Sequence, residues 1–456
     1  MHGEIRFFLL KIYPVHDIMD GIFMQFRRSL LNGEENVMIK TGPETATRKE
    51  TPSTATDGRQ WHKMKYNFDT CPDRRGTGCY KYDFREEFNA PEDALPLWVA
   101  DMDFTSAPVI VDALKQAAEH GVYGYHGARD DYYQAVMNWY EGHFGWKSEK
   151  DWIVTTPGVV FAINLCIHAF TAPQDGVLIQ QPVYYPFARS VKTNGRRLVN
   201  NPLICDGGRY RIDFADFEKK IRDEKVRLFV LCSPHNPVGR IWTEEELRRM
   251  EEICLANDVI VVSDEIHSDF VWEGHTHHIL AGLDPKYQKN VITCTAPSKT
   301  FNIAGLQCSN IFIPDPDLRA AFKTALDATG YGDLNLFALA ACRAAYTGGG
   351  EWLEQAKQYI WDNICMAVCF TEQNIPGVRM LRPEGTYLLW ADLRELGLGA
   401  RERQDLVLHR AKVWLDRGEM FGPEGAGFER INDACPRPML EQALQQLAAA
   451  VSSLGL

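Results

Sequence analysis

The sequence lacks most of the features that mark specialised classes of protein. No apolar run approaches the roughly 20 residues that a membrane-spanning helix requires. The 12 cysteines include no CxxC pair and no Cys/His spacing typical of a metal site, which argues against a disulfide framework and a zinc module. Positive charge is scarce, because 49 Lys and Arg face 61 Asp and Glu, a net charge of −12. Phosphate affinity comes largely from clustered Lys and Arg, so we expect no nucleic-acid partner.

What the sequence does contain is the composition of an ordinary globular protein. Its 456 residues are 45% hydrophobic and 24% charged, enough to build a sizeable core in two or three domains. Cysteines without a disulfide pattern favour a reducing compartment. We therefore expect a cytoplasmic protein with no membrane partner and no bound metal.

The first sixty or so residues differ from the rest of the chain. Residues 7–10 form a short apolar burst, and residues 41–60 are rich in Thr, Pro and charge. The burst is too short for a secretory signal, whereas a transit-type presequence stays open. We interpret residues 1–63 as a poorly ordered extension outside the main fold, with Met64 as an alternative start.

The central part of the chain alternates between two patterns. Short β-branched runs predict strands at 152–155, 176–180, 227–232, 258–263 and 290–295. Amphipathic stretches between them predict helices at 160–170, 187–193, 214–224 and 243–257. The last helix opens with Thr243 and Glu246 in the spacing of a capping box. This alternation predicts an α/β protein with a mostly parallel sheet covered on both faces.

The C-terminal part follows a different order. It predicts helices at 351–373, 400–418 and 439–454, and strands at 378–381 and 387–392. Helices and strands are mixed here without regular alternation, which indicates a second, smaller α+β domain.

Polar residues follow several of the predicted strands, and ligands of α/β sheets bind at the carboxyl ends of the strands. The turn before Val159 and Val160 offers free N–H groups of a helix to an anion. Asn236 precedes a proline, Asp264 ends a buried strand, and Lys299 follows another one. A lysine in apolar surroundings can act as a Schiff-base nucleophile.

Each of these signals also has a purely structural explanation. Asn236 fits a plain Asn-Pro turn. Asp264 fits a helix N-cap or a structural ion pair. Lys299 fits a solvated surface side chain. Taken one at a time, the residues leave both interpretations open.

The ordered set of motifs is more specific. It resembles the pyridoxal 5'-phosphate (PLP) enzymes of fold type I, in the class I/II aminotransferase superfamily, and within it the MalY/PatB-type cystathionine β-lyases. The resemblance covers residues 66 to 456. It is carried by these segments: 75–77 (RGT), 81–83 (KYD), 98–104 (WVADMDF), 123–125 (YGY), 236–239 (NPVG), 264–267 (DEIH), 298–302 (SKTFN), 427–432 (GFERIN) and 435–437 (CPR).

The resemblance implies roles for these residues. Lys299 would bond covalently to PLP and move the substrate's Cα proton. Asp264 would pair with the pyridine nitrogen, and Asn236 with the ring O3′ and the substrate. Tyr184 would stack on the ring, with Tyr185 a close competitor.

Further roles concern both ends of the site. The phosphate would be bound by the N–H groups of Val159 and Val160 and by Ser298. His267 stands where many relatives carry a Tyr beside O3′. Arg430 would clamp the substrate α-carboxylate, and Tyr125 would reach the PLP phosphate of the other subunit in a homodimer with shared sites.

The chain departs from the aminotransferase pattern at the phosphate. Ala296 stands where a phosphate-binding Ser is common, and Gln307 where an Arg is common. These changes fit the lyase branch without proving elimination, because lyases and aminotransferases share the residues that would carry out the chemistry.

The resemblance therefore implies β-elimination on cystathionine or related S-substituted cysteines, giving a thiol, pyruvate and ammonia. The alternatives are an aminotransferase and a regulatory protein that retains the fold. We expect residues 64–110 to form an N-terminal arm and part of the small domain. Residues 111–345 would form the PLP-binding domain, and residues 346–456 the rest of the small domain.

Overall fold

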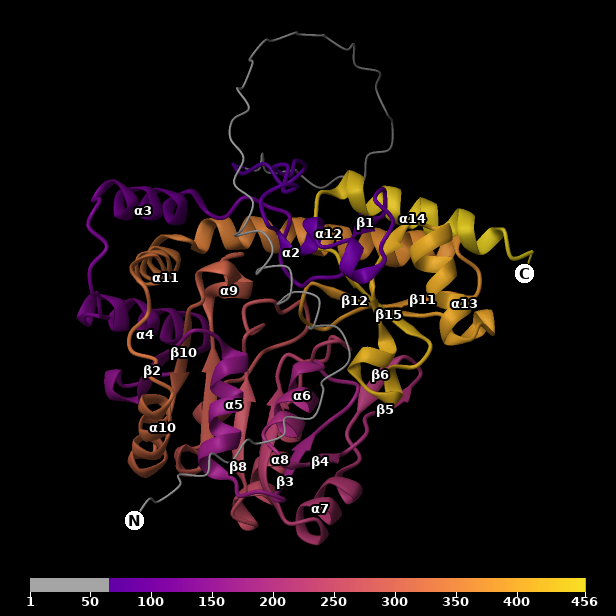
Figure 1. Ribbon diagram of the computed structural model, residues 1–456. Helices are drawn as coiled ribbons and strands as arrows, with labels where there is room; N and C mark the ends of the chain where they lie inside the picture. Colours follow the sequence, from indigo (N-terminus) through magenta and orange to yellow (C-terminus); the bar gives the residue numbers. More distant parts are fainter. Residues whose placement is uncertain (1–64, 456) are drawn as a thin grey trace, which may run out of the picture. The chain divides into compact units, whose positions relative to one another are not determined.

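The computed structural model describes residues 65–455 (Figure 1). The predicted extension, residues 1–63, lies outside the described residues. Residues 65–83 and 91–455 belong to one compact unit, and residues 84–90, with the 3₁₀ turn η1 (Glu86–Phe88), fall outside it. No helix in the described part of the chain is long and apolar enough to cross a membrane. The predicted boundaries at residues 110 and 345 stay predictions.

A seven-stranded sheet forms the centre of this unit. Its order is β2-β10-β9-β8-β7-β3-β4, and all neighbours are parallel except β10, which is antiparallel to both β2 and β9. The α/β prediction with a mostly parallel sheet is confirmed. The strands are β2 (Ile153–Thr156), β10 (Ser309–Phe312), β9 (Val291–Thr295), β8 (Ile260–Asp264), β7 (Val226–Cys232), β3 (Gly176–Ile179) and β4 (Arg197–Asn200).

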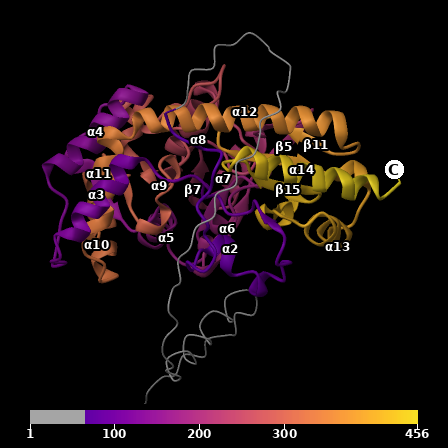
Figure 2. The same ribbon diagram turned by 90° about the horizontal axis from the view of Figure 1, so that it is seen from above.

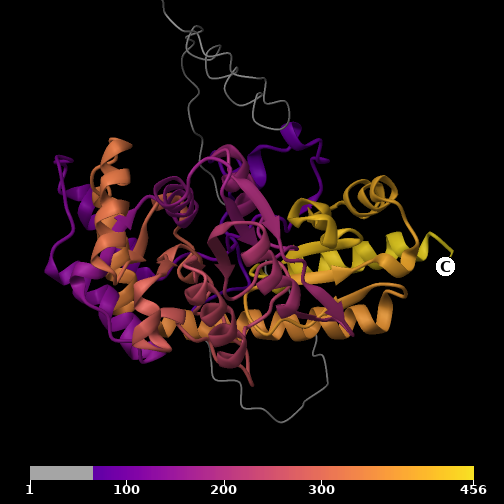
Figure 3. The same ribbon diagram turned by 90° about the horizontal axis from the view of Figure 1, so that it is seen from below.

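Helices cover both faces of this sheet, and the strand residues alternate between them. Leu228 and Val230 of β7 join one apolar cluster, whereas Phe229 and Leu231 join the other. The first cluster is completed by α5 (Val159–Phe170), α6 (Pro186–Thr193) and α10 (Pro316–Ala328). The second is completed by α4 (Asp130–Phe144), α7 (Phe214–Asp223), α8 (Glu244–Ala256) and α11 (Leu336–Gly348). Figure 3 shows helices on both sides of the strands.

A second sheet is small and antiparallel, in the order β11-β12-β15-β14. Its strands are β11 (Arg379–Leu381), β12 (Leu388–Asp392), β15 (Phe428–Asn432) and β14 (Asp416–Arg417). The helices α12 (Gly350–Asn374) and α14 (Arg437–Ser452) run side by side next to it (Figure 2). The predicted second group of helices and strands is therefore present.

Smaller elements connect these parts. The strand β1 (Leu95–Pro96) pairs in parallel with β13 (Val413–Trp414), which ties the region after α2 (Tyr80–Asp83) to the C-terminal part. The strands β5 (Ile204–Asp206) and β6 (Arg209–Arg211) form a hairpin. The sequence pattern did not predict β10, α4, α10, α11 or α3 (Pro108–Glu119).

One predicted helix is wrong in its last part. Residues 400–418 begin as α13 (Ala400–Gln404) and continue as the π-helical segment η7 (Asp405–Arg410), but β13 and β14 follow. Val413 and Trp414 are buried against β1, and Asp416 pairs with Arg430 of β15. Pairing with strands distant in the sequence overrides the helical pattern here.

The capping box predicted for α8 is confirmed. The Thr243 hydroxyl accepts from the Glu246 N–H at 3.1 Å, and the Glu246 carboxylate accepts from the Thr243 N–H at 2.9 Å. These two bonds use N–H groups that the first turn of a helix otherwise leaves free.

Removing this cap should destabilise the protein. We expect Thr243→Ala to lower the free energy of unfolding by about 1 kcal/mol, because an N–H of α8 loses its acceptor. Chemical denaturation followed by circular dichroism measures the change. Thr347→Ala is the control, since this exposed hydroxyl only bonds back to the Arg343 carbonyl within α11. Equal losses in the two variants would contradict the prediction.

Candidate active site

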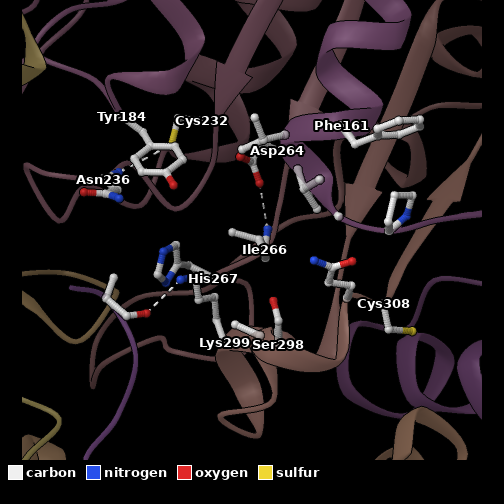
Figure 4. Close-up of a pocket in the computed structure, with 17 residues that line it drawn as sticks. Phe161, Tyr184, Cys232, Asn236, Asp264, Ile266, His267, Ser298, Lys299 and Cys308 are labelled. Carbon is white, nitrogen blue, oxygen red and sulfur yellow. Dashed lines mark hydrogen bonds between the residues drawn. The ribbon is translucent and has the colours of Figure 1, made fainter. Parts of the chain in front are cut away.

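A cavity of about 400 Å³ opens at the carboxyl ends of β7, β8 and β9. Asn236 follows the end of β7, Asp264 is the last residue of β8, and Lys299 follows β9 in the short helix α9 (Pro297–Thr300). All three line the cavity (Figure 4). The convergence predicted from the strand ends is therefore present.

Asp264 lies deep in this cavity. It pairs in register with Cys232 of β7 and Cys294 of β9, and its carboxylate accepts from the Ile266 N–H at 3.2 Å. Burial raises the pKa of Asp264 to about 7, although the Ile266 N–H and the charge of Lys299 favour the ionised form. Near neutral pH this carboxyl group is thus ready to gain or lose a proton.

Lys299 faces Asp264 across the cavity. Its ammonium group donates to the carbonyl oxygen of Ala100 at 2.7 Å. Burial lowers the pKa of Lys299 to about 8, and the charge of Arg430 acts in the same direction, while Asp101 opposes it. A considerable fraction of the amine is therefore neutral, and hence nucleophilic, near pH 8.

A buried cluster of charges fixes the segment that carries Ala100. The Lys81 ammonium is fully buried and contacts Asp103 at 2.6 Å. Arg74 contacts Asp103 at 2.6 Å and Asp101 at 2.5 Å. These side chains attach residues 98–104 to the rest of the unit, so the acceptor of Lys299 is firmly positioned.

Arg430 lies on β15, beside Asn236. One terminal nitrogen, Nη1, donates to Asn236 Oδ1 at 3.0 Å, and the other, Nη2, donates to the Trp98 carbonyl at 2.9 Å. Nη2 also donates to Asp416 Oδ2, from the neighbouring strand β14. Arg430 and Asp416 are both buried.

His267 and Tyr184 complete the walls near Asn236. Burial lowers the pKa of His267 well below its usual value, and the charges of Lys299 and Arg430 act in the same direction, so the imidazole is neutral. Within the described part of the chain its Nδ1 atom has no hydrogen-bond partner. Tyr184 lines the cavity and Tyr185 does not, and the stacking role expected of Tyr184 stays a prediction.

The far end of the cavity is formed by the start of α5. Val159 and Val160 are its first two residues, and no side chain from residues 65–455 caps this terminus. Ser298 and Gln307 also line the cavity. Among the lining residues that the structure describes, Lys299 is the one lysine or arginine, so an anion at this end would be bound mainly by neutral donors.

Tyr125 lies away from this cavity in the single chain. It is fully exposed, in the segment between α3 and α4, and it does not line the pocket. Its predicted role concerns a second subunit and stays a prediction.

Some parts of the site were not identified from the sequence. The Ala100 carbonyl is a backbone atom, and its signal was the motif at 98–104. Asp416 lies in the stretch predicted as a helix, which concealed its pairing with Arg430. The thiols of Cys232 and Cys308 also line the cavity, and no sequence signal pointed to them.

Comparison with known proteins shows which family the chain matches. Residues 92–447 match the family described as aminotransferase class I and II. The cystathionine beta-lyase PatB of Bacillus subtilis is 45% identical over 386 residues, which are 85% of this chain and 100% of PatB. The structure of cystalysin from Treponema denticola, which contains PLP, has a TM-score of 0.83 and 37% identity, covering 86% of this chain and 100% of cystalysin. The PLP-bound C–S lyase from Staphylococcus hominis has a TM-score of 0.81 and 32% identity, covering 85% of this chain and 99% of the lyase.

The two cavity thiols should be poor nucleophiles. Burial raises the pKa of Cys232, whereas the pKa of Cys308 is raised first by its hydrogen bond with the Cys342 thiol and then by burial. Since the thiolate is the reactive form, we expect iodoacetamide to label exposed Cys369 at least about tenfold faster than either thiol near neutral pH. Peptide mass spectrometry measures the labelling, with unfolded protein as the control. Rapid labelling of Cys232 in folded protein would contradict the prediction.

Proposed function

The chain belongs to the class I and II aminotransferase family, and from this premise we propose that it is a PLP-dependent carbon–sulfur β-lyase. Its substrate would be cystathionine or a related S-substituted cysteine, and its products a thiol, pyruvate and ammonia. The observation that carries the proposal is the similarity of the chain, over their full lengths, to PatB and to C–S lyases. It is accompanied by a cavity lined by Lys299 and Asp264, with Arg430 hydrogen-bonded to the lining residue Asn236.

The residues of the cavity fit PLP. A pyridine nitrogen needs an anion, and Asp264 is a buried carboxyl group that forms no ion pair with any residue the structure describes. A phosphate needs N–H donors, and the start of α5 has no side-chain cap. The partnerless Nδ1 of neutral His267 is available to a polar ring substituent.

These properties assign each residue to a part of the cofactor. Lys299 would bond to it covalently, Asp264 would bind its pyridine nitrogen, and Tyr184 would stack on its ring. Asn236 and His267 would bind the ring oxygen. The N–H groups of Val159 and Val160 and the hydroxyl of Ser298 would bind its phosphate. When bound, PLP supplies an electron sink for negative charge at the substrate's Cα.

The side chains of the protein carry out the remaining steps. Arg430 binds the α-carboxylate of the substrate, a task suited to a planar guanidinium. The neutral amine of Lys299 accepts the Cα proton, and its pKa of about 8 matches this use as a general base near neutral pH. The hydrogen bond to Ala100 sets the position from which the amine acts. The Cβ–S bond then breaks, and the sulfur leaves as a thiolate.

An aminotransferase is the second candidate, because the matching family is described as aminotransferase class I and II. The two reactions use the same Lys299, Asp264 and Arg430, so the products must distinguish them. We expect the purified protein to release pyruvate and a thiol from cystathionine with no added keto acid. Amino transfer that requires a keto acid, without thiol release, would exclude the lyase.

Replacing Lys299 tests the catalytic assignment. We expect Lys299→Ala to lower the rate of pyruvate release by at least about 10³-fold, because the base is lost. The yellow cofactor adduct that borohydride reduces should also disappear. Lys289→Ala, at an exposed position, is the matched control. An adduct that persists in Lys299→Ala would show that another lysine binds the cofactor.

We also propose that two chains form a homodimer in which Tyr125 completes the partner's phosphate site. Its full exposure in one chain supports this proposal. Tyr125→Ala alone should weaken PLP binding by about tenfold or more, since a hydrogen bond to a charged group is lost.

Mixed dimers test whether the sites are shared. A dimer of one Tyr125→Ala chain and one Lys299→Ala chain contains one intact site if Tyr125 crosses between subunits. Such a purified mixed dimer should show about half the wild-type activity. Activity no higher than the mean of the two parent variants would contradict a shared site.

A further inference from the structure

Arg430 already makes hydrogen bonds that a substrate carboxylate would need. As a result, neither side of its guanidinium group is completely free to bind the carboxylate with two hydrogen bonds. A guanidinium group has five N–H donors, one on Nε and two on each terminal nitrogen. A carboxylate binds it with two parallel hydrogen bonds along one of two edges, Nη1 with Nη2 or Nε with Nη2. Both edges include Nη2.

Both hydrogens of Nη2 are already in use. One is donated to the Trp98 carbonyl oxygen and the other to Asp416. The free donors of Arg430 are Nε–H, which is buried without a partner among the described residues, and one hydrogen on Nη1. These two point along different edges, so they cannot hold one carboxylate together.

The Trp98 carbonyl is firmly anchored and is the less easily displaced of the two acceptors. The neighbouring Leu97 N–H donates to the Trp414 carbonyl, and the Leu97 carbonyl accepts from the Asn432 N–H, both within 2.9 Å. The Trp98 ring also stacks on Trp414, with ring centroids 4.6 Å apart. Asp416, in contrast, reaches Nη2 with a side chain that can rotate, and it carries the same charge as an arriving carboxylate.

We propose that Asp416 is an internal competitor of the substrate, which occupies Arg430 in the free enzyme and must release Nη2 before the α-carboxylate is bound by two hydrogen bonds. The inference rests on the proposed function, in which Arg430 binds that carboxylate. Asp416 is thus a specificity-determining residue that weakens substrate binding without touching the reacting atoms.

The surroundings of Asp416 favour a carboxylate whose hydrogen bond to Arg430 can be broken. Burial raises the pKa of Asp416, although the charge of Arg430 and, less strongly, that of Arg417 oppose the shift. The phenol groups of Tyr184 and Tyr185 also lie within electrostatic range. Two carboxylates against one guanidinium would repel each other, so arrival of the substrate drives Asp416 away or favours its protonation.

The test removes the charge and keeps the shape. In the PLP-loaded enzyme, we expect Asp416→Asn to lower the KM for cystathionine about tenfold with little change in kcat, because the fraction of enzyme ready to bind rises. Glycine is not cleaved, and its binding can be measured from the change in the cofactor's absorbance. We expect glycine to bind about tenfold more tightly to the variant. A purely supporting role for Asp416 predicts the opposite, since a badly oriented Arg430 would raise KM and weaken glycine binding.

A matched control is available on the same sheet. Asp392 of β12 pairs with the exposed Arg394 at 2.7 Å, and neither residue lines the cavity. Asp392→Asn should leave KM and glycine binding unchanged. If Asp416→Asn does not fold, Asp416→Ser removes the same charge and leaves a hydroxyl to accept from Arg430.

The outcomes also separate this inference from the proposed function. Tighter glycine binding in the Asp416 variant, in an enzyme that releases no pyruvate, would support the inference and overturn the lyase. Unchanged or weaker glycine binding in a folded variant that still releases pyruvate would overturn the inference and leave the lyase in place.

Discussion

Ionisable groups buried at the carboxyl ends of three parallel strands are the constraint on which this structure depends. Parallel pairing of β7, β8 and β9 brings their ends to one edge, and there the chain places the buried Asp264 and the partly buried Lys299. Burial penalises the charged form of each group, which brings both pKa values close to neutral pH. The same two groups would be ordinary surface charges on a loop. Their chemistry therefore follows from the sheet.

The side chains of Lys299 and Arg430 need hydrogen-bond acceptors in fixed positions, and the segment at 98–104 provides them. Its charges are buried against Lys81 and Arg74, and breaking a buried pair of this kind costs about 3–5 kcal/mol. The Ala100 carbonyl, which accepts from Lys299, and the Trp98 carbonyl, which accepts from Arg430, belong to the same segment. One strip of backbone thus positions both the proposed base and the proposed carboxylate clamp.

The proposed lyase shares its inner residues with aminotransferases, so differences between the two must lie further out. The site offers an anion few positive charges at the end formed by α5, where the uncharged side chain of Gln307 lines the cavity. At the other end, Asp416 neutralises Arg430. Both features reduce the electrostatic attraction of the site for anions and leave binding to precise hydrogen bonds. The acidic net charge of −12 acts in the same direction at long range.

The sequence by itself determined the strand–helix alternation, the capping box at Thr243 and the polar residues at the strand ends, because each depends on neighbours within a few positions. The motifs added the identity of Lys299, Asp264 and Arg430 as candidates. Only the tertiary structure showed that Tyr184 lines the cavity and Tyr185 does not, because the sequence does not determine which of two adjacent residues faces a cavity. It also replaced the predicted helix at 411–418 with β13 and β14, whose partners at β1 and β15 are distant in the chain. For the same reason the pairing of Asp416 with Arg430 could not be predicted: it exists only where two strands meet in register.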